Sequence, residues 1–281
     1  MLPIDSGGLS FPSVVALALP CFIASVNASS ELIKFVLGSR YDLTDEAGEA
    51  SAMWEQDTEV QLVNDAASRC TRTLVKLRSQ AGLSRLKSGP PEAQVASRLM
   101  CLSSEEAGAF LTGPPSTCLR TRIDSAAFTC AIRIRMAQPV AAESLCSCGQ
   151  DLDANGAYAL ACRRGAGKQI RHRILNEFVR RAFLAAGMPV LLEPTGLSRK
   201  NGKRPDGVTV LLFQNGRALS WDATCVHPLA ASYADVALKA PKAVAALAET
   251  RKRSKYLPVL DRVDFVPLAV ETTGAVGSSF L

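Results

Sequence analysis

Apolar residues in the first half of the chain recur at spacings typical of helices. Ser30–Leu37 and Val60–Leu83 carry them near a 3.6-residue period, which predicts one short and one long helix. Two further helices are predicted at Glu92–Leu102 and Asp124–Met136, separated from their neighbours by proline-containing breaks. The pattern therefore predicts a helical region over residues 1–140, without a catalytic constellation of side chains.

The second half alternates between helical and strand patterns. The predicted elements are, in chain order, a helix at Lys168–Ala186, strands at Val190–Pro194, Asp206–Phe213 and Ala218–Val226, a helix at Ala230–Tyr256 bent at Pro241, and a strand at Asp264–Glu271. The first helix has an apolar residue at every fourth position of one face: Ile170, Ile174, Phe178, Ala182 and Ala186. This order predicts an α/β fold with a mixed central sheet covered by helices on both faces.

The stretch Leu9–Val26 is the one candidate membrane segment that the apolar pattern offers. It contains Pro12 and Pro20, follows no basic residue and is short for a membrane span. We therefore expect buried helix and strand material in a soluble protein, and no membrane partner.

Charge is distributed unevenly along the chain, whose formal net charge is +6. Residues 1–140 carry 13 basic and 14 acidic residues, a net charge of −1, whereas residues 141–281 carry 19 and 12, a net charge of +7. The excess predicts a polyanionic partner for the second half. Nine cysteines without a disulfide framework indicate a reducing, intracellular location, either nuclear or cytoplasmic.

Two acidic residues, Asp206 and Asp222, interrupt the apolar strands of a predicted hairpin. A carboxylate inside a sheet is costly unless a charge or hydrogen bond compensates it. A two-residue turn would place Asp206 opposite Cys225 and turn the two carboxylates to opposite faces. A three-residue turn, Gln214-Asn215-Gly216, would place Asp206 opposite Thr224, with Asp222 a diagonal neighbour about 7–8 Å away on the same face. Small or polar residues alternate with apolar ones along the second strand, which favours the three-residue turn.

Side chains at this spacing can converge on one divalent cation, and oxygen ligands of this type suit Mg²⁺. The basic helix and loop on either side would bring the phosphate backbone of a nucleic acid to the cation. The alternative is that both aspartates are capping or ion-paired residues at strand ends, with Arg204 or Lys203 as partner. The spacing alone does not decide between the two interpretations.

Three segments resemble the signature of the restriction-like endonuclease of non-LTR retrotransposons: Arg204-Pro205-Asp206, Trp221-Asp222-Ala223-Thr224 and Lys252-Arg253-Ser254-Lys255-Tyr256. That domain follows the reverse transcriptase in the element's protein and belongs to the PD-(D/E)xK nuclease superfamily, whose core order is αβββαβ. The resemblance is strong over residues 146–271 and loose before them. It implies a helical linker over 1–140, a degenerate Cys-rich knuckle over 141–165 and a restriction-endonuclease-like domain over 166–281.

The resemblance implies cleavage of one DNA strand at a time, by water that attacks a phosphodiester and leaves a 3′-hydroxyl. Asp206 and Asp222 would hold Mg²⁺, with the carbonyl of Ala223 as a third ligand. Lys252 or Lys255 would stabilise the charge of the pentavalent phosphorus or orient the water.

Further residues carry weaker expectations. Glu193 is a candidate for an additional catalytic carboxylate, although a salt bridge is the favoured interpretation for it. DNA binding is expected from the basic helix, the basic loop and the end of the signature: Arg171, Arg173, Lys203, Arg204 and Tyr256. DNA is the expected partner, and RNA of the parent element is a second candidate.

Cys146, Cys148 and Cys162 are spaced like the thiolates of the zinc knuckle in such elements. The position of the expected histidine holds Tyr158, and tyrosine is a poor zinc ligand. Either Zn²⁺ is bound by the three cysteines with His172 as the fourth ligand, or the knuckle is degenerate and its thiols are free. The tyrosine favours the second interpretation.

Two hypotheses for function remain: an Mg²⁺-dependent nicking endonuclease, and a catalytically inactive remnant that at most binds nucleic acid. Tyr233-Ala234-Asp235-Val236 is similar to a polymerase motif but has one aspartate where two-metal polymerisation needs two, so polymerase activity is not expected. The sequence predicts neither the target sequence nor the oligomeric state.

Overall fold

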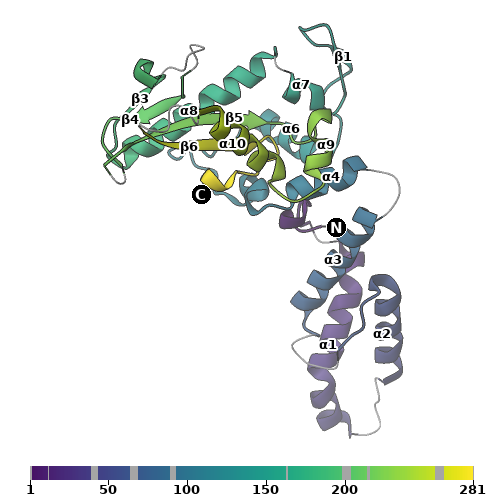
Figure 1. Ribbon diagram of the computed structural model, residues 1–281. Coiled ribbons are helices and arrows are strands. Elements are labelled where there is room, and N and C mark those ends of the chain that lie inside the picture. The colour runs from purple at the N-terminus through teal and green to yellow at the C-terminus, as the bar shows by residue number, and fades with distance from the viewer. Residues whose placement is uncertain are drawn as a thin grey trace. The chain divides into compact units, whose positions relative to one another are not determined.

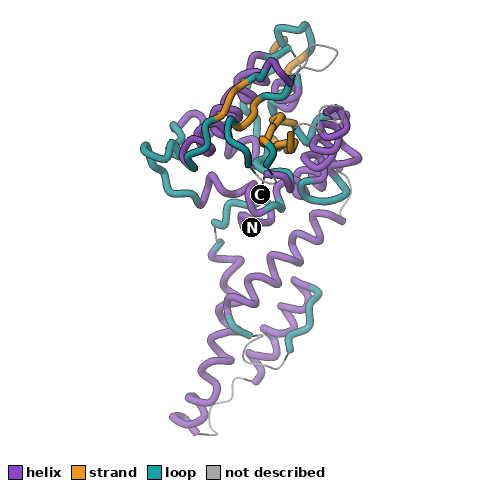
Figure 2. Tube along the Cα trace, turned by 60° about the vertical axis from the view of Figure 1, so that its left-hand side comes forward, coloured by secondary structure: helices purple, strands orange, loops and turns teal. Residues whose placement is uncertain are grey.

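The computed structural model describes residues 2–11, 13–38, 44–63, 69–88, 93–162, 164–197, 204–213, 216–256 and 263–280. The chain forms two compact units, Met1–Ala96 and Ser97–Leu281. The strands of the described residues lie in the second unit, and the first unit consists of helices and loops (Figure 2). The three predicted domains, with boundaries near residues 140 and 165, stay a prediction.

The first unit packs its helices around a small apolar core. Its elements are the 3₁₀ helix η1 (Ile4–Ser6), α1 (Val14–Leu37), α2 (Thr44–Thr58) and α3 (Thr71–Ser88). Ile23 of α1, Trp54 of α2 and Leu74 of α3 are buried against one another. The next helix, α4 (Ala93–Leu102), contains the boundary between the units, and the part of the predicted helix that falls on Glu92 lies outside the described residues.

Helix α1 corrects the prediction for the N-terminal apolar stretch. It runs without interruption through Pro20 and includes the helix predicted at Ser30–Leu37 as its last part. Among the described residues it is the one helix long and apolar enough to cross a membrane, with a mean hydropathy of 1.5 over an 18-residue window that is only 11% buried. The predicted helix is therefore present from Val14 onward, whereas the predicted burial and strand are wrong.

The second unit begins with short helical segments. These are η3 (Glu105–Gly108), α5 (Ala109–Thr112) and α6 (Ser125–Arg135). The carboxylate of Asp124 accepts a hydrogen bond from the N–H of Ala127 at 2.9 Å and caps α6. The helix predicted at Asp124–Met136 is therefore confirmed.

A small cysteine-bearing hairpin precedes the main sheet. Strands β1 (Ser144–Leu145) and β2 (Asp151–Leu152) pair antiparallel, and α7 (Ala157–Ala161) follows them. The long helix α8 (Ala166–Ala185) comes next. The guanidinium of Arg171 in α8 donates to the carbonyl of Leu160 at 2.7 Å, which connects α8 to the hairpin.

The main sheet has four strands in the order β3-β4-β5-β6. They are β3 (Val190–Leu192), β4 (Gly207–Thr209), β5 (Ala218–Val226) and β6 (Val263–Glu271). The first three are antiparallel, whereas β5 and β6 are parallel, so the predicted mixed sheet in an α/β fold is confirmed. Between β5 and β6 lie η5 (Ala231–Tyr233), α9 (Ala234–Ala237) and α10 (Ala243–Tyr256), and η7 (Ser278–Phe280) follows β6.

Helices cover both faces of this sheet (Figure 1). Val179 of α8 packs with Trp221 and Leu268 on one face. Ala245 and Ala248 of α10 pack with Ala269 on the other. Side chains on neighbouring positions of β5 therefore contact different helices, and the polar groups of α8 and α10 can reach β5 from opposite sides.

The hairpin formed by β4 and β5 has a different register from the predicted one. Gly207 lies opposite Trp221, so the prediction that Asp206 faces Thr224 is wrong. The alternative that pairs Asp206 with Cys225 is also inconsistent with this register. Asp206 comes one residue before the ladder, and its N–H donates to the carbonyl of Trp221 at 2.9 Å.

The shift in register arises between β4 and the turn. The predicted strand Asp206–Phe213 is shorter in the structure and ends at Thr209. There the hydroxyl oxygen of Thr209, in place of a backbone carbonyl, accepts the hydrogen bond from the N–H of Leu219 at 3.0 Å. Residues 210–213 are exposed and lie outside the sheet. Gln214 and Asn215, the predicted start of the turn, lie outside the described residues.

Helix α8 packs on the sheet through a different face from its apolar stripe. Ile170, Ile174 and Phe178 of that stripe are exposed. The packed face carries Val179 together with the buried amide of Asn176. A polar residue occupies this face because its hydrogen bonds are satisfied there, as the site below shows.

Candidate metal and nucleic-acid site

Three donors fix the carboxylate of Asp206 at the start of β4. Its Oδ2 atom lies 2.7 Å from the backbone N of Ala223, 3.1 Å from Nδ2 of Asn176 and 2.9 Å from Nε2 of His172. The backbone donor comes from β5, and the two side chains come from α8. Ala223 thus contributes its N–H to the cluster, and the metal-binding role of its carbonyl stays a prediction.

The carboxylate of Asp222 lies in the middle of β5 and contacts α10. The ammonium of Lys252 donates to its Oδ1, and Nζ of Lys255 lies 3.9 Å from its Oδ2. The side chain of Asp222 is only 4% exposed, so its charge depends on these two lysines for compensation. Both lysines come from the predicted signature, and their spacing of three residues places them on one face of α10.

Asp206 and Asp222 lie close together despite the altered register, although the side-chain partners of Asp206 come from α8 and those of Asp222 come from α10. One oxygen of each carboxylate and one ring nitrogen of His172 all lie within 4.8 Å of one another. Gly207 lies opposite Trp221 in the antiparallel ladder, so the two aspartates occupy the next position outward on each strand and are neighbours across it. Two oxygen atoms and one nitrogen atom thus form a group able to hold a divalent cation.

Hydrogen bonding stabilises the ionised forms of Asp206 and His172. Burial raises the pKa of Asp206, but the hydrogen bonds from His172, Asn176 and the N–H of Ala223 hold it below its usual value. The hydrogen bond to Asp206 raises the pKa of His172, against the opposing effects of burial and of the charge on Lys252. A carboxylate that is ionised near neutral pH is suited to bind a cation.

Asn176 supports the cluster from the core side of α8. Its Oδ1 accepts a hydrogen bond from the indole Nε1 of Trp221 at 3.0 Å, while its Nδ2 donates to Asp206. Trp221 is fully buried and stacks on Phe183 at 5.2 Å between ring centroids. The indole therefore fixes which end of the amide faces Asp206. This residue was not predicted from the sequence, where its one signal is a polar side chain a single helical turn after His172.

The other predicted carboxylate lies apart from the cluster. The side chain of Glu193 is 71% exposed, and its Oε2 lies 3.1 Å from the guanidinium of Arg204. The favoured interpretation of Glu193 as a salt-bridge residue agrees with this contact. Lys203, which was predicted to bind DNA, lies outside the described residues.

Two residues predicted to bind DNA have structural contacts instead. Tyr256 is 1% exposed; its hydroxyl donates to the carbonyl of Arg204 at 2.9 Å, and its ring packs 4.8 Å from that of Phe265. The prediction that this side chain contacts DNA is therefore wrong, because the side chain is buried. Arg171 is half-buried and bonded to Leu160, whereas Arg173 is exposed on α8.

The three knuckle cysteines lie together, but without His172. The sulfur of Cys162 is 3.7 Å from that of Cys146 and 3.8 Å from that of Cys148. The hydroxyl of Tyr158 is 3.1 Å from the sulfur of Cys148, and this hydrogen bond lowers the pKa of that thiol to about 7. The prediction of His172 as the fourth zinc ligand is wrong, because its imidazole contacts Asp206 instead. A zinc ion at the three thiolates stays a prediction.

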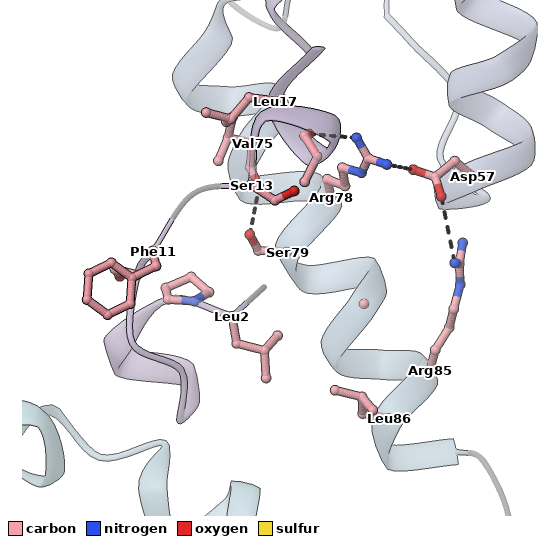
Figure 3. Close-up of a pocket in the computed structure, with 14 residues that line it drawn as sticks. Leu2, Phe11, Ser13, Leu17, Asp57, Val75, Arg78, Ser79, Arg85 and Leu86 are labelled. Carbon is pink, nitrogen blue, oxygen red and sulfur yellow. Dashed lines mark hydrogen bonds and ion pairs between the residues drawn. The ribbon is translucent and has the colours of Figure 1, made fainter. Parts of the chain in front are cut away.

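The first unit contains a pocket of about 500 Å³ between the N-terminal segment, α1 and α3 (Figure 3). Arg78 lies at its edge, where its guanidinium donates to the carbonyl of Ala16 at 2.6 Å and pairs with Asp57 at 2.8 Å. Arg85 approaches the same carboxylate at 3.9 Å. These contacts pair the charges that line the pocket and join the helices of this unit, so we assign the pocket no ligand.

Comparisons with known proteins leave the family untested. No protein-family model matches the chain. No curated protein matches its sequence. The resemblance to retrotransposon endonucleases therefore stays a prediction that depends on the residues of the signature.

Proposed function

We propose that the second unit is a divalent-cation-dependent DNA endonuclease that nicks one strand by hydrolysis of a phosphodiester. The observation that carries this proposal is the group formed by Asp206, Asp222 and His172 within 4.8 Å, beside the ammonium groups of Lys252 and Lys255. Such a group combines ligands for a cation with positive charge for a phosphate.

The order of the elements supports a restriction-like architecture for this proposal. Helix α8, strands β3, β4 and β5, helix α10 and strand β6 follow one another in the sequence αβββαβ that the resemblance implies, with minor helical turns between them. In that arrangement Asp206 stands at the second strand and Asp222 in the third. These are the positions at which the resemblance places the two acids of the PD-(D/E)xK superfamily.

The residues present fit a divalent cation, for which Asp206 and Asp222 would each supply a carboxylate oxygen. Such an ion, when bound, supplies Lewis acidity to the phosphate and makes a bound water more acidic. Lys252 and Lys255 would place positive charge beside the phosphate oxygens, which become more negative as the phosphorus becomes pentavalent. Water would lose a proton to the solvent and form a bond to phosphorus as the bond to the 3′-oxygen breaks, and that oxygen would take up a proton from the solvent and leave as a 3′-hydroxyl.

The test is nicking of a supercoiled plasmid by the full chain, in Mg²⁺ or Mn²⁺ and in EDTA. We expect nicking with either cation, none in EDTA, and a loss of at least 100-fold in Asp206→Asn and Asp222→Asn, since one ligand of the ion is weakened in each. Asp264→Asn is the matched control, because Asp264 is a partly exposed aspartate on β6 that pairs with Arg217. Nicking that survives in both site variants would contradict the proposal.

A nucleic-acid-binding module without hydrolysis is the second candidate. The ammonium of Lys252 already pairs with Asp222, which lessens the charge available to a cation. This candidate predicts salt-sensitive DNA binding by the basic second unit, no cleavage in any divalent cation, and no effect of the two aspartate substitutions. Filter binding at several salt concentrations, run beside the nicking assay, separates the two.

A further inference from the structure

The candidate cation site contains an imidazole as well as two carboxylates. We infer that His172 is a direct ligand of the cation, and that the site for this reason prefers Mn²⁺ to Mg²⁺. This inference rests on the proposed function, since it names the ion of the same site. It also replaces the expectation of Mg²⁺ bound by carboxylates and a backbone carbonyl.

The distances fit a single ion. Ligand atoms that surround one cation at about 2.1 Å are roughly 3 Å apart when adjacent and roughly 4.2 Å apart when opposite. The ring nitrogen of His172 lies 2.9 Å from Oδ2 of Asp206, and the three ligand atoms, with that of Asp222, lie within 4.8 Å of one another. Small side-chain movements would therefore suffice to place all three around one ion.

Asp206 has two hydrogen-bond donors besides the imidazole. Oδ2 of Asp206 is already held by the N–H of Ala223 at 2.7 Å and by the amide of Asn176 at 3.1 Å. That amide is in turn fixed by Trp221 from the buried side. The side chain of His172 is 44% exposed, so its ring can rotate from this hydrogen bond to a cation without disturbing the core.

The nature of the ligands determines which ion is preferred. Mg²⁺ binds oxygen almost exclusively and keeps much of its water, whereas first-row transition-metal ions gain affinity from an imidazole nitrogen. Mn²⁺ is the member of that series that is also best suited to carboxylates. Two carboxylates and one imidazole therefore favour Mn²⁺ over Mg²⁺.

The chain has a second group of metal-binding type, and the probe must not report on it. Cys146, Cys148 and Cys162 offer thiolates, which bind zinc and similar softer ions. Mn²⁺ binds thiolates weakly and is therefore the appropriate probe for the site at His172. Its free concentration is measured directly by electron paramagnetic resonance, and Mg²⁺ is added as the competitor.

The experiment measures Mn²⁺ binding to the full chain, and the Mg²⁺ concentration that displaces it, in three variants of His172. We expect His172→Ala to weaken Mn²⁺ binding by 10-fold or more, a loss of the order seen when groups around a metal are removed. His172→Asp, which replaces nitrogen by oxygen, should lower the preference for Mn²⁺ over Mg²⁺ by about 10-fold. His172→Gln keeps a hydrogen-bond donor to Asp206 but removes the imidazole, and it should therefore bind Mn²⁺ more weakly than the wild type.

His227→Asn is the matched control, because His227 is the other histidine of the chain. It follows the last residue of β5, and its ring forms a hydrogen bond with Thr272. The preference of this control variant for Mn²⁺ over Mg²⁺ should equal that of the wild type.

The inference would be overturned if His172→Gln or His172→Ala bound Mn²⁺ as tightly as the wild type. It would also be overturned if His172→Asp kept the wild-type preference for Mn²⁺ over Mg²⁺. Circular dichroism in EDTA checks that each variant is folded.

Failure of the proposed function has a different signature. If Mn²⁺ binds through His172 but plasmid is not nicked, the endonuclease proposal fails while the assignment of the ligand stands. If plasmid is nicked, and Asp222→Asn prevents this, while substitutions of His172 leave the choice of ion unchanged, the function stands and the ligand assignment is overturned.

Discussion

The ion pair between Lys252 and Asp222 provides the most quantitative prediction from the structure. The substitution Lys252→Met keeps most of the apolar stem and removes the ammonium that donates to Oδ1 of Asp222. The side chain of Asp222 is 4% exposed and that of Lys252 is 21% exposed, so water can solvate the carboxylate of Asp222 only in part after the ammonium is removed. The substitution therefore leaves a buried carboxylate with less compensation.

The expected loss of stability follows from this burial. Removal of one partner from a fully buried pair costs about 3–5 kcal/mol. Here Nζ of Lys255 stays 3.9 Å from Oδ2 of Asp222, and Lys252 is itself partly exposed, so we expect about 2–3 kcal/mol. For a unit of this size each kcal/mol lowers Tm by about 2–4 °C, which predicts a decrease of roughly 4–12 °C in EDTA.

A divalent cation should reverse this loss. An ion at 100 times its Kd stabilises the folded state by about 2.7 kcal/mol, and in Lys252→Met it no longer competes with the ammonium for Asp222. The variant should therefore gain more from Mn²⁺ than the wild type gains. Calorimetric unfolding with and without Mn²⁺ measures both effects, with Lys239→Met, an exposed lysine, as control. Equal stability of variant and wild type in EDTA would refute the reasoning, as would an equal gain from Mn²⁺.

Two further substitutions test the surroundings of the site, and a third tests a buried histidine away from it. Asn176→Leu removes a donor to Asp206 and leaves the indole of Trp221 without its acceptor, so denaturant unfolding should show a loss of about 2–5 kcal/mol; an unchanged midpoint would contradict the geometry. Gly207→Ala directs a methyl group into the ring of Trp221, and we expect a loss of about 1–3 kcal/mol in the same assay unless the ring moves. Burial lowers the pKa of His227 from 6.5 to about 4. Between these two pH values the unfolded chain therefore binds a proton that the folded chain does not, and the stability of the wild type should decrease as the pH falls from 6.5 to about 4. His227→Asn should show a weaker dependence of stability on pH in this range.

The strands that lie in the middle of the sheet were predictable from the sequence. Strand β5 has the predicted bounds, Ala218–Val226, and β6 begins one residue before the predicted start. Both are apolar on successive positions because helices cover both faces, and that pattern depends little on neighbouring loops. Helix α10 likewise begins after Pro241, where the predicted helix was expected to bend.

The register of β4 was not predictable in the same way. Thr209 replaces a backbone acceptor with its hydroxyl, and the following residues leave the sheet. The alternation of apolar and polar residues does not report such a side-chain hydrogen bond. The same limit applies to α1, whose apolar composition predicted burial although only 11% of its most apolar window is buried.

Within the site, the sequence identified the residues whose burial is costly and missed those that compensate them. Asp206 and Asp222 were evident as charges inside apolar strands. His172 and Asn176 lie on a helix whose orientation about its axis depends on contacts with Trp221, and no local pattern contains that information. Tyr256 was expected to contact DNA but is buried, because its hydroxyl finds a backbone acceptor in the core.

We propose that Asp206, Asp222 and His172 hold one divalent cation beside Lys252 and Lys255. Diffraction from crystals of the full chain soaked in Mn²⁺, with anomalous differences recorded near the manganese edge, would locate such an ion. We expect a single strong peak about 2.1–2.3 Å from an oxygen of each aspartate and from Nε2 of His172. A strong peak elsewhere together with an empty cluster, or carboxylates turned away from each other, would contradict it.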